Sequence, residues 1–256
     1  MNKTKIEWVR GLNGELGYTW NPVTGCLHGC TYCYAERIAK RFGAHWQSSA
    51  ITRYQKEPYK ENGVYNPYPF DFMPTFHHYR LQEPTKKTKS QNIFVCSMAD
   101  LFGYWVPDSW IQDVFEACEA APQHRYLFLT KNPKRYNDLQ FKLPLPTSDR
   151  YWYGITMESM EAYYKRARET KVMLGYKMFL SIEPVQTEIE FSPATLGLIK
   201  WVIVGAQTGP GAKAPDPEWV QSIINQCRSA GVPIFLKNNL NWPVRIQEYP
   251  WEKGSE

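Results

Sequence analysis

This sequence lacks a long apolar run and a strong charge of one sign. Nowhere do 18 apolar residues follow one another, so we expect no membrane-spanning helix. The opening residues, MNKTKIEWVRG, contain no apolar core of signal-peptide length, which predicts a cytoplasmic protein. The formal net charge of +5 permits an anionic partner but does not by itself indicate a nucleic-acid binder.

Internal repeats and low-complexity tracts are also absent. Aromatic residues are plentiful, with 10 Trp, 17 Tyr and 12 Phe, and this content excludes a disordered chain because such side chains need a core. The length of 256 residues suits one large domain, since barrels of alternating strands and helices reach about 250 residues as single units. We therefore predict one domain over residues 1–256.

Short apolar segments alternate with segments of helical period from about residue 90 onward. They predict strands over 93–97, 126–130, 151–155, 178–182, 201–204 and 233–236, and a first strand is predicted earlier, over 16–20. Continuous apolar runs of this length are typical of parallel strands buried on both faces. Strands separated by helices build right-handed crossovers, so the pattern predicts an α/β fold, a partial barrel with one strand fewer than a closed eight-fold barrel.

Capping residues and periodicity predict the helices between these strands. Asp108 or Ser109 is expected to cap one helix and Asp216 another, with Pro217 at its first position. Further helices are predicted over 133–139, from Met160 through Tyr163 and Tyr164 to Ala167, and along the apolar face of Ala35, Ile38, Ala39 and Phe42.

Residues 43–92 break this rhythm. The segment is rich in Tyr and Pro and has no steady period. Its length exceeds that of ordinary loops, which favours a lid or an inserted subdomain. A surface excursion that packs its aromatic rings on the barrel is an equal alternative to substrate binding.

Three of the six cysteines form a cluster with C-x3-C-x2-C spacing. Cys26, Cys30 and Cys33 lie in a loop between a strand and a helix, whereas Cys96, Cys118 and Cys227 are scattered and expected in the core. In a reducing compartment, clustered thiols indicate metal or redox chemistry before disulfides. Three thiolates can hold three irons of a 4Fe-4S cluster and leave the fourth iron open to S-adenosylmethionine. Structural zinc, with His28 or a distant residue as fourth ligand, is the alternative.

The cysteine motif, with Tyr32 before its last Cys, resembles the radical S-adenosylmethionine (radical SAM) superfamily. Further segments resemble a phage-associated radical-SAM-like family: WNPVTGC at 20–26, CYAER at 33–37, PTFHHYRLQEP at 74–84, IFVCSMADLFG at 93–103, FLTKNP at 128–133, LSIEPV at 180–185 and WVIVGAQTGPGAKAPDPEWV at 201–220. This chain departs from many members in its closer first two cysteines and in Cys96, where Asn is usual. The resemblance implies a partial (β/α)6-type TIM barrel with an added C-terminal strand, a 4Fe-4S cluster and S-adenosylmethionine. A more remote similarity is to spore photoproduct lyase, which repairs DNA with the same radical.

Polar residues follow the predicted strands at their carboxyl ends, where chemistry sits in such barrels. They are Ser97, Asp100, Thr130, Lys131, Thr156, Glu158, Glu183, Gln207, Thr208, Lys237 and Asn238. We expect the backbone around Tyr32 to meet the adenine, and Ser97, Thr156 and Glu158 to bind ribose hydroxyls or the methionine ammonium. Asp100 stands where the superfamily commonly has a Gly-Gly-Glu stretch, and Gln207 lies in a glycine-rich segment that permits close approach to the cofactor.

Lys131, Glu183 and Lys237 are the predicted catalytic residues. They face the substrate or form buried ion pairs, and the sequence leaves both options open. The preferred function is a radical SAM enzyme that modifies or repairs a nucleic acid or nucleotide, with an electron donor such as flavodoxin or ferredoxin. The alternatives are the same chemistry on a small metabolite or peptide, and a non-enzymatic binding module stabilised by zinc or a cluster.

Overall fold

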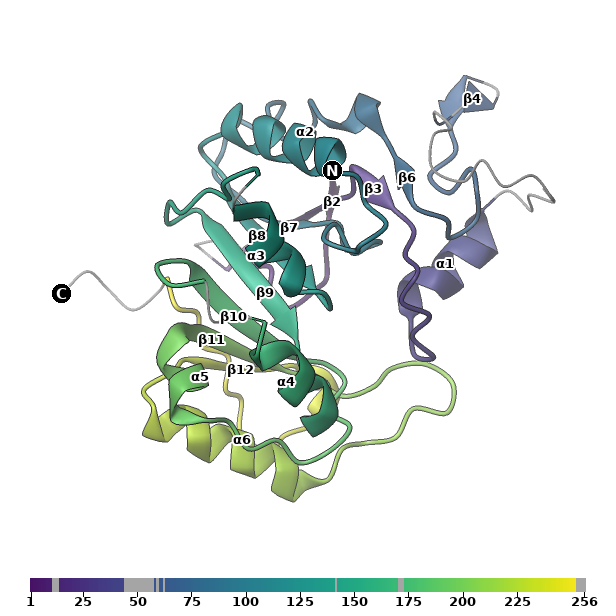
Figure 1. The fold of residues 1–256 in the computed structure, drawn as a ribbon. Coiled ribbons are helices and arrows are strands. Elements are labelled where there is room, and N and C mark those ends of the chain that lie inside the picture. Colours follow the sequence, from purple (N-terminus) through teal and green to yellow (C-terminus); the bar gives the residue numbers. More distant parts are fainter. Residues whose placement is uncertain are drawn as a thin grey trace.

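The fold is built on one mostly parallel sheet (Figure 1). The computed structural model describes residues 1–10, 14–43, 58, 60, 61, 63–140, 142–169 and 173–251. Within them, eight strands run in the order β1-β2-β7-β8-β9-β10-β11-β12. Their bounds are Asn2–Lys3, Tyr18–Trp20, Asn92–Val95, Arg125–Thr130, Tyr151–Thr156, Lys177–Ile182, Ile199–Val204 and Ile234–Leu236. Only β1 is antiparallel to its neighbour, and no pairing among the described strands joins β1 to β12, so the sheet stays open.

The seven predicted strands are all present, as the parallel part of this sheet. The strand expected over 93–97 is too long, because β7 ends at Val95. The next residue, Cys96, has a φ of 59°, which an extended strand does not tolerate. Its amide still donates to the Trp20 carbonyl at 2.7 Å, and the chain then turns away to begin the loop that carries Ser97 and Asp100.

The helices alternate with the strands along the chain and cover the sheet, and α1 lies apart from the other helices (Figure 1). Their bounds are α1 Tyr34–Phe42, α2 Asp108–Glu119, α3 Lys134–Gln140, α4 Met160–Ala167, α5 Pro193–Leu198 and α6 Pro217–Ser229. The capping prediction at Asp216 is confirmed, since its carboxylate accepts from the Glu218 amide at 2.8 Å. The cap predicted at Asp108 or Ser109 is wrong: Pro107 takes that position and the Asp108 carboxylate pairs with Arg135.

In two helices, fewer residues are buried than the apolar periodicity of the sequence predicts. In α4 the ring of Tyr163 is buried, whereas Tyr164 is 58% exposed. In α1 only Ala35 and Ala39 are buried, and Ile38 and Phe42 are partly or largely exposed.

Side chains of the parallel strands alternate between two hydrophobic clusters, as expected for a sheet buried on both faces. One cluster joins the strands to helices α2 to α6. The opposite face is packed with large rings and aliphatic side chains from the strands and both chain ends: Trp8, Phe94, Leu127, Trp152, Phe179, Trp201, Ile203, Phe235 and Tyr249. The open sheet is thus filled rather than hollow over the described residues.

The Tyr- and Pro-rich segment expected over 43–92 falls partly outside the described residues. Its described part contains β4 (Lys60–Glu61), β5 (Val64–Tyr65), β6 (Thr75–Phe76) and the 3-10 helix η1 (His78–Arg80). Strand β6 pairs antiparallel with β3 (Val23–Thr24), directly before the cysteine loop. A second 3-10 helix, η2 (Asn238–Leu240), follows β12. None of the helices over the described ranges is both long and apolar enough to cross a membrane.

Candidate functional site

The cysteine loop is fixed at its start by backbone contacts that only glycine permits. Gly25 has a φ of +86°, and a Cβ there would lie 2.2 Å from the Met73 carbonyl oxygen. Its amide donates to the Met98 carbonyl at 2.9 Å, and the Cys26 amide donates to the Phe72 carbonyl at 3.0 Å. These bonds tie Cys26 to the segment before β6 and to the loop after β7.

The loop ends at the start of α1, where Cys33 serves as the helix cap. The Cys33 amide donates to the Cys30 carbonyl at 3.0 Å, which closes a tight turn between the second and third cysteines. The Cys33 sulfur accepts from the Glu36 amide at 3.3 Å. The positive end of the helix therefore points at this thiol.

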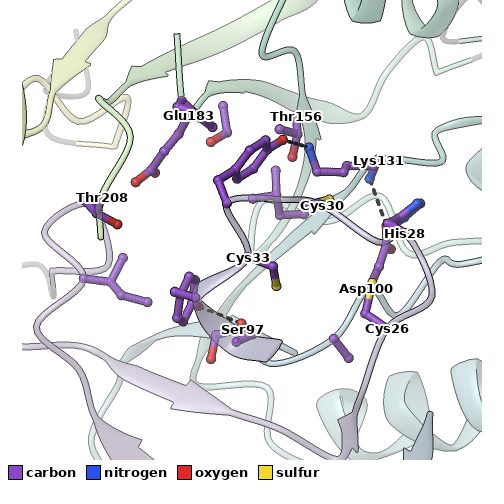
Figure 2. Close-up of a pocket in the computed structure, with 18 of the residues that line it drawn as sticks. Cys26, His28, Cys30, Cys33, Ser97, Asp100, Lys131, Thr156, Glu183 and Thr208 are labelled. Carbon is purple, nitrogen blue, oxygen red and sulfur yellow. Dashed lines mark hydrogen bonds and ion pairs between the residues drawn. The ribbon is translucent and has the colours of Figure 1, made fainter. Parts of the chain in front are cut away.

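A cavity of about 290 Å³ opens between this loop and the carboxyl ends of the strands (Figure 2). This volume is at the lower end of the range for small-molecule pockets. Its lining includes every residue predicted for the site except Glu158: Cys26, Cys30, Tyr32, Cys33, Ser97, Asp100, Lys131, Thr156, Glu183, Gln207 and Lys237. The structure thus brings together side chains from seven separate segments, although their roles stay predictions.

Glu158 lies behind the cavity wall and organises two of its lining residues. Its carboxylate accepts from the Lys131 ammonium at 2.7 Å and from the Tyr32 hydroxyl at 3.2 Å, and it is paired with the guanidinium of Arg166. Burial opposes ionisation of Glu158, but the hydrogen bonds from Arg166 and the charge of Lys131 outweigh it and lower its pKa to about 2. Arg166 was not predicted, because nothing in the sequence of α4 distinguishes it from a surface arginine.

Asp100 is also engaged by the protein rather than free for a ligand. Its oxygens accept from the Thr130 hydroxyl at 2.7 and 2.9 Å, from the Lys131 amide at 2.9 Å and from the Phe102 amide at 3.0 Å. One oxygen lies 2.7 Å from the His28 ring nitrogen, a contact marked in Figure 2. Asp100 therefore joins the end of β8 to the middle of the cysteine loop.

The wall formed by Ser97 depends on two residues that the sequence reasoning missed. The Tyr34 hydroxyl donates to the Ser97 carbonyl at 2.7 Å. The Asn21 side-chain oxygen accepts from the Ser97 hydroxyl at 3.2 Å and from the Met98 amide at 3.0 Å. Both residues lie in segments singled out by resemblance, around WNP and CYAER, which was the available signal for them.

Glu183 and Lys237 face the cavity as an ion pair from the ends of β10 and β12. Gly205 makes this approach possible, since a Cβ there would lie 2.9 Å from the Lys237 side chain and 3.1 Å from that of Glu183. The ion-pair alternative left open by the sequence is thus realised here, and again for Lys131 with Glu158.

The segment between β11 and α6 extends across to α1 (Figure 1). Arg37 on α1 donates to the Thr208 carbonyl at 3.4 Å. Gly209, with a φ of +100°, leaves room for the guanidinium, because a Cβ would lie 2.7 Å from its nitrogen. This contact ties α1 to the segment of Gln207 and Thr208, which lines the cavity.

Two of the thiols around the cavity, Cys26 and Cys30, are protonated at neutral pH in the metal-free chain. Burial raises the pKa of Cys26 to about 12 and raises that of Cys30, although the charge of Lys131 opposes the rise at Cys30. Over the described residues, no three His, Cys, Asp or Glu side chains converge closely enough to hold a single metal ion. Cys96, Cys118 and Cys227 are buried free thiols, as predicted.

The fold and site define an α/β protein with an open, mostly parallel sheet and a thiol-lined cavity at its carboxyl edge. Residues 3–252 match the model of a family described as "Protein of unknown function (DUF5131)", and the chain belongs to this family. A comparison with curated proteins finds no match.

Several solved structures of spore photoproduct lyase are remotely similar to the chain. A double mutant with bound AdoMet and dinucleoside spore photoproduct is 11% identical with a TM-score of 0.44, covering 88% of this chain and 62% of that one. The complex with dinucleoside spore photoproduct is 11% identical with a TM-score of 0.47, covering 92% and 79%. A single mutant is 11% identical with a TM-score of 0.48, covering 92% and 78%. The chain thus spans less than two thirds of the first of these proteins.

Proposed function

We propose that this protein is a radical SAM enzyme that holds a 4Fe-4S cluster on Cys26, Cys30 and Cys33. The observation that carries the proposal is that three thiols from one C-x3-C-x2-C loop line one cavity at the carboxyl edge of a parallel sheet. A cubane cluster does not need its thiolates at one point, because each binds a different iron.

The donor set fits such a cluster by its chemistry. All three candidate ligands are thiols, which iron-sulfur clusters use, and Cys33 also caps the start of α1. Burial keeps Cys26 and Cys30 protonated without metal, so loading is expected to release protons. When bound, the cluster would supply one electron to S-adenosylmethionine and generate a 5′-deoxyadenosyl radical.

The residues of the cavity divide into two groups. Ser97, Thr156 and Gln207 have polar side chains on the lining and are assigned to S-adenosylmethionine, together with the backbone around Tyr32. Asp100 and Glu158 are assigned as positioning residues, because protein donors already occupy their oxygens. The Glu183–Lys237 pair is left to face the substrate.

We assign a nucleic acid or nucleotide as substrate. The support is the excess of positive charge and the aromatic segment before β7, whose rings can stack on bases. A one-electron donor such as flavodoxin or ferredoxin and a reducing, cytoplasmic setting complete the proposal.

Anaerobic reconstitution with iron and sulfide tests the chemistry. We expect cluster absorbance, an electron paramagnetic resonance signal after dithionite, and 5′-deoxyadenosine from S-adenosylmethionine. Cys30→Ala should lose all three, whereas Cys227→Ala, a buried thiol on α6, should keep them. Protein that binds about one zinc and no iron under these conditions, as a structural site would, refutes the proposal.

A further inference from the structure

We infer that the substrate is a single-stranded polynucleotide, held along a track of three adjoining cavities that ends at the cysteines. This inference rests on the proposed function and names its substrate class. The first cavity, here the cysteine cavity, is the one described above. The bridging cavity, of about 390 Å³, and the outer cavity, of about 530 Å³, continue from it.

Shared lining residues place the three cavities next to one another. The bridging cavity has Ile6, Tyr34, Ser97 and Lys237 in common with the cysteine cavity. It has Thr19 in common with the outer cavity. The inferred track runs over these shared residues, from the outer cavity to the thiols.

The outer cavity carries a stacked aromatic pair flanked by cations. The rings of Tyr65 and Tyr79 lie 3.7 Å apart between centroids and are nearly parallel, at 5°. The Lys60 ammonium lies 5.0 Å from the Tyr65 ring centroid, and the Arg80 guanidinium lies 5.4 Å from that of Tyr79. Aromatic platforms beside positive charge are what single-stranded nucleic-acid grooves use, because every base offers a flat face and every linkage a phosphate.

Charge along the track also favours a polyanion. Its acidic side chains are already engaged: Glu83 with the amino group of Met1, Glu183 with Lys237, and Glu7 with the Asn238 amide at 2.8 Å. The exposed Lys5 and Lys60 form no ion pair with any residue that the structure describes. Lys5 lines the bridging cavity and Lys60 lines the outer cavity, so both ammonium groups can meet phosphates along the track.

A polymer accounts for the whole track, whereas a small metabolite does not. Under the proposed function the cysteine cavity must also hold S-adenosylmethionine, so the reacting nucleotide enters from the bridging cavity beside Tyr34 and Lys237. A neighbouring nucleotide then reaches Tyr65 and Lys60. A mononucleotide would leave the outer cavity unused.

Fluorescence anisotropy with a labelled thymidine oligomer of about ten nucleotides, a length within the usual site sizes, tests this inference. The assay uses reconstituted protein without reductant or S-adenosylmethionine, so turnover plays no part. We expect binding at low salt, at least about tenfold weaker for Tyr65→Leu, and a salt slope smaller by about one for Lys60→Ala. The matched controls, Tyr164→Leu and Lys165→Ala, are exposed residues of α4 that line none of the three cavities, and both variants should bind as the wild type does.

Three results would overturn the track: no binding at low salt, unchanged binding by both track variants, or equal affinity for a duplex of the same sequence. The two proposals fail separately. Variants that keep cluster absorbance and form 5′-deoxyadenosine while the oligomer does not bind refute the track alone. Oligomer binding that depends on Tyr65 in a protein that never takes up iron refutes the radical chemistry alone.

Discussion

Among single residues, His77 links the aromatic segment to the strand before the cysteines. Its side chain is fully buried, with one ring nitrogen 2.8 Å from the Thr24 hydroxyl and the other 3.3 Å from the Tyr79 hydroxyl. Burial, with a smaller contribution from the charge of Arg80, lowers the pKa of His77 to about 3. The imidazole is therefore neutral at pH 7 and can both donate and accept a hydrogen bond.

This neutral state makes stability depend on pH in a defined window. Below about pH 6.5 the unfolded chain protonates His77 and the folded chain does not, so unfolding becomes easier as the pH falls. The contribution of His77 to the unfolding free energy is complete above that pH and is lost progressively as the pH falls toward 3. We expect His77→Gln to remove about 2 kcal/mol of the difference in unfolding free energy between pH 7 and pH 5, measured by urea denaturation.

His124 provides the comparison for this measurement, because burial also lowers its pKa. His124→Gln should remove its own part of the pH dependence, and the part that only His77→Gln removes belongs to His77. Equal slopes for the wild type and His77→Gln would contradict the assignment.

At the scale of elements, the cysteine loop is positioned by glycine as much as by cysteine. Gly25 and Gly29 both have positive φ, at 86° and 66°. Only Gly25 is also crowded, by the backbone of Met73, whereas a Cβ at Gly29 would meet nothing within 4 Å. Substitutions at the two positions therefore separate the cost of backbone strain at positive φ from the cost of a steric clash.

Alanine at these glycines should give unequal effects. Gly29→Ala carries only the conformational penalty, roughly 1 kcal/mol. Gly25→Ala adds a clash with backbone that cannot rotate away, and we expect a loss of unfolding free energy larger by at least about 1 kcal/mol. It should also speed labelling of Cys26 by a thiol reagent, because the bonds to Phe72 and Met98 break. Equal stability and equal labelling of the two variants would show that Gly25 does not position the loop.

The sequence predicts elements better than the partners of individual side chains. Apolar runs specify strands buried on both faces, and polar residues that follow them reach one edge of the sheet, so Ser97, Lys131 and Glu183 were placed at one cavity in advance. The boundary at Cys96 and the cap at Pro107 were missed, because a backbone turn and an ion pair of Asp108 override local preference. Contacts such as that of Arg166 with Glu158 form only when the folded chain brings the two side chains together, and no periodic pattern in the sequence marks them.

For the whole molecule, the open sheet is completed by the chain ends rather than by further strands. Trp8 lies on the face away from the helices, with its ring centroid 4.7 Å from Phe94, 6.0 Å from Phe179 and 6.2 Å from Trp201. The C-terminal segment joins it, since the Tyr249 hydroxyl donates to the Glu7 carbonyl at 2.9 Å. These residues fill the space that side chains of a closed barrel would occupy, and Ile6 and Trp8 also line the cysteine cavity.

Removing Trp8 should therefore affect both the stability and the cavity floor. Trp8 is 2% exposed, and Trp8→Ala is expected to lower the unfolding free energy by about 3–5 kcal/mol, the usual cost of truncating a buried large aromatic residue. Tyr164→Ala, at a residue 58% exposed on α4, should cost less than about 1 kcal/mol. Urea denaturation measures both, and similar losses for the two variants would contradict the role of the N-terminal segment. If the chain ends close the sheet, Trp8→Ala should also weaken binding in the cysteine cavity, because its loss leaves that floor without support.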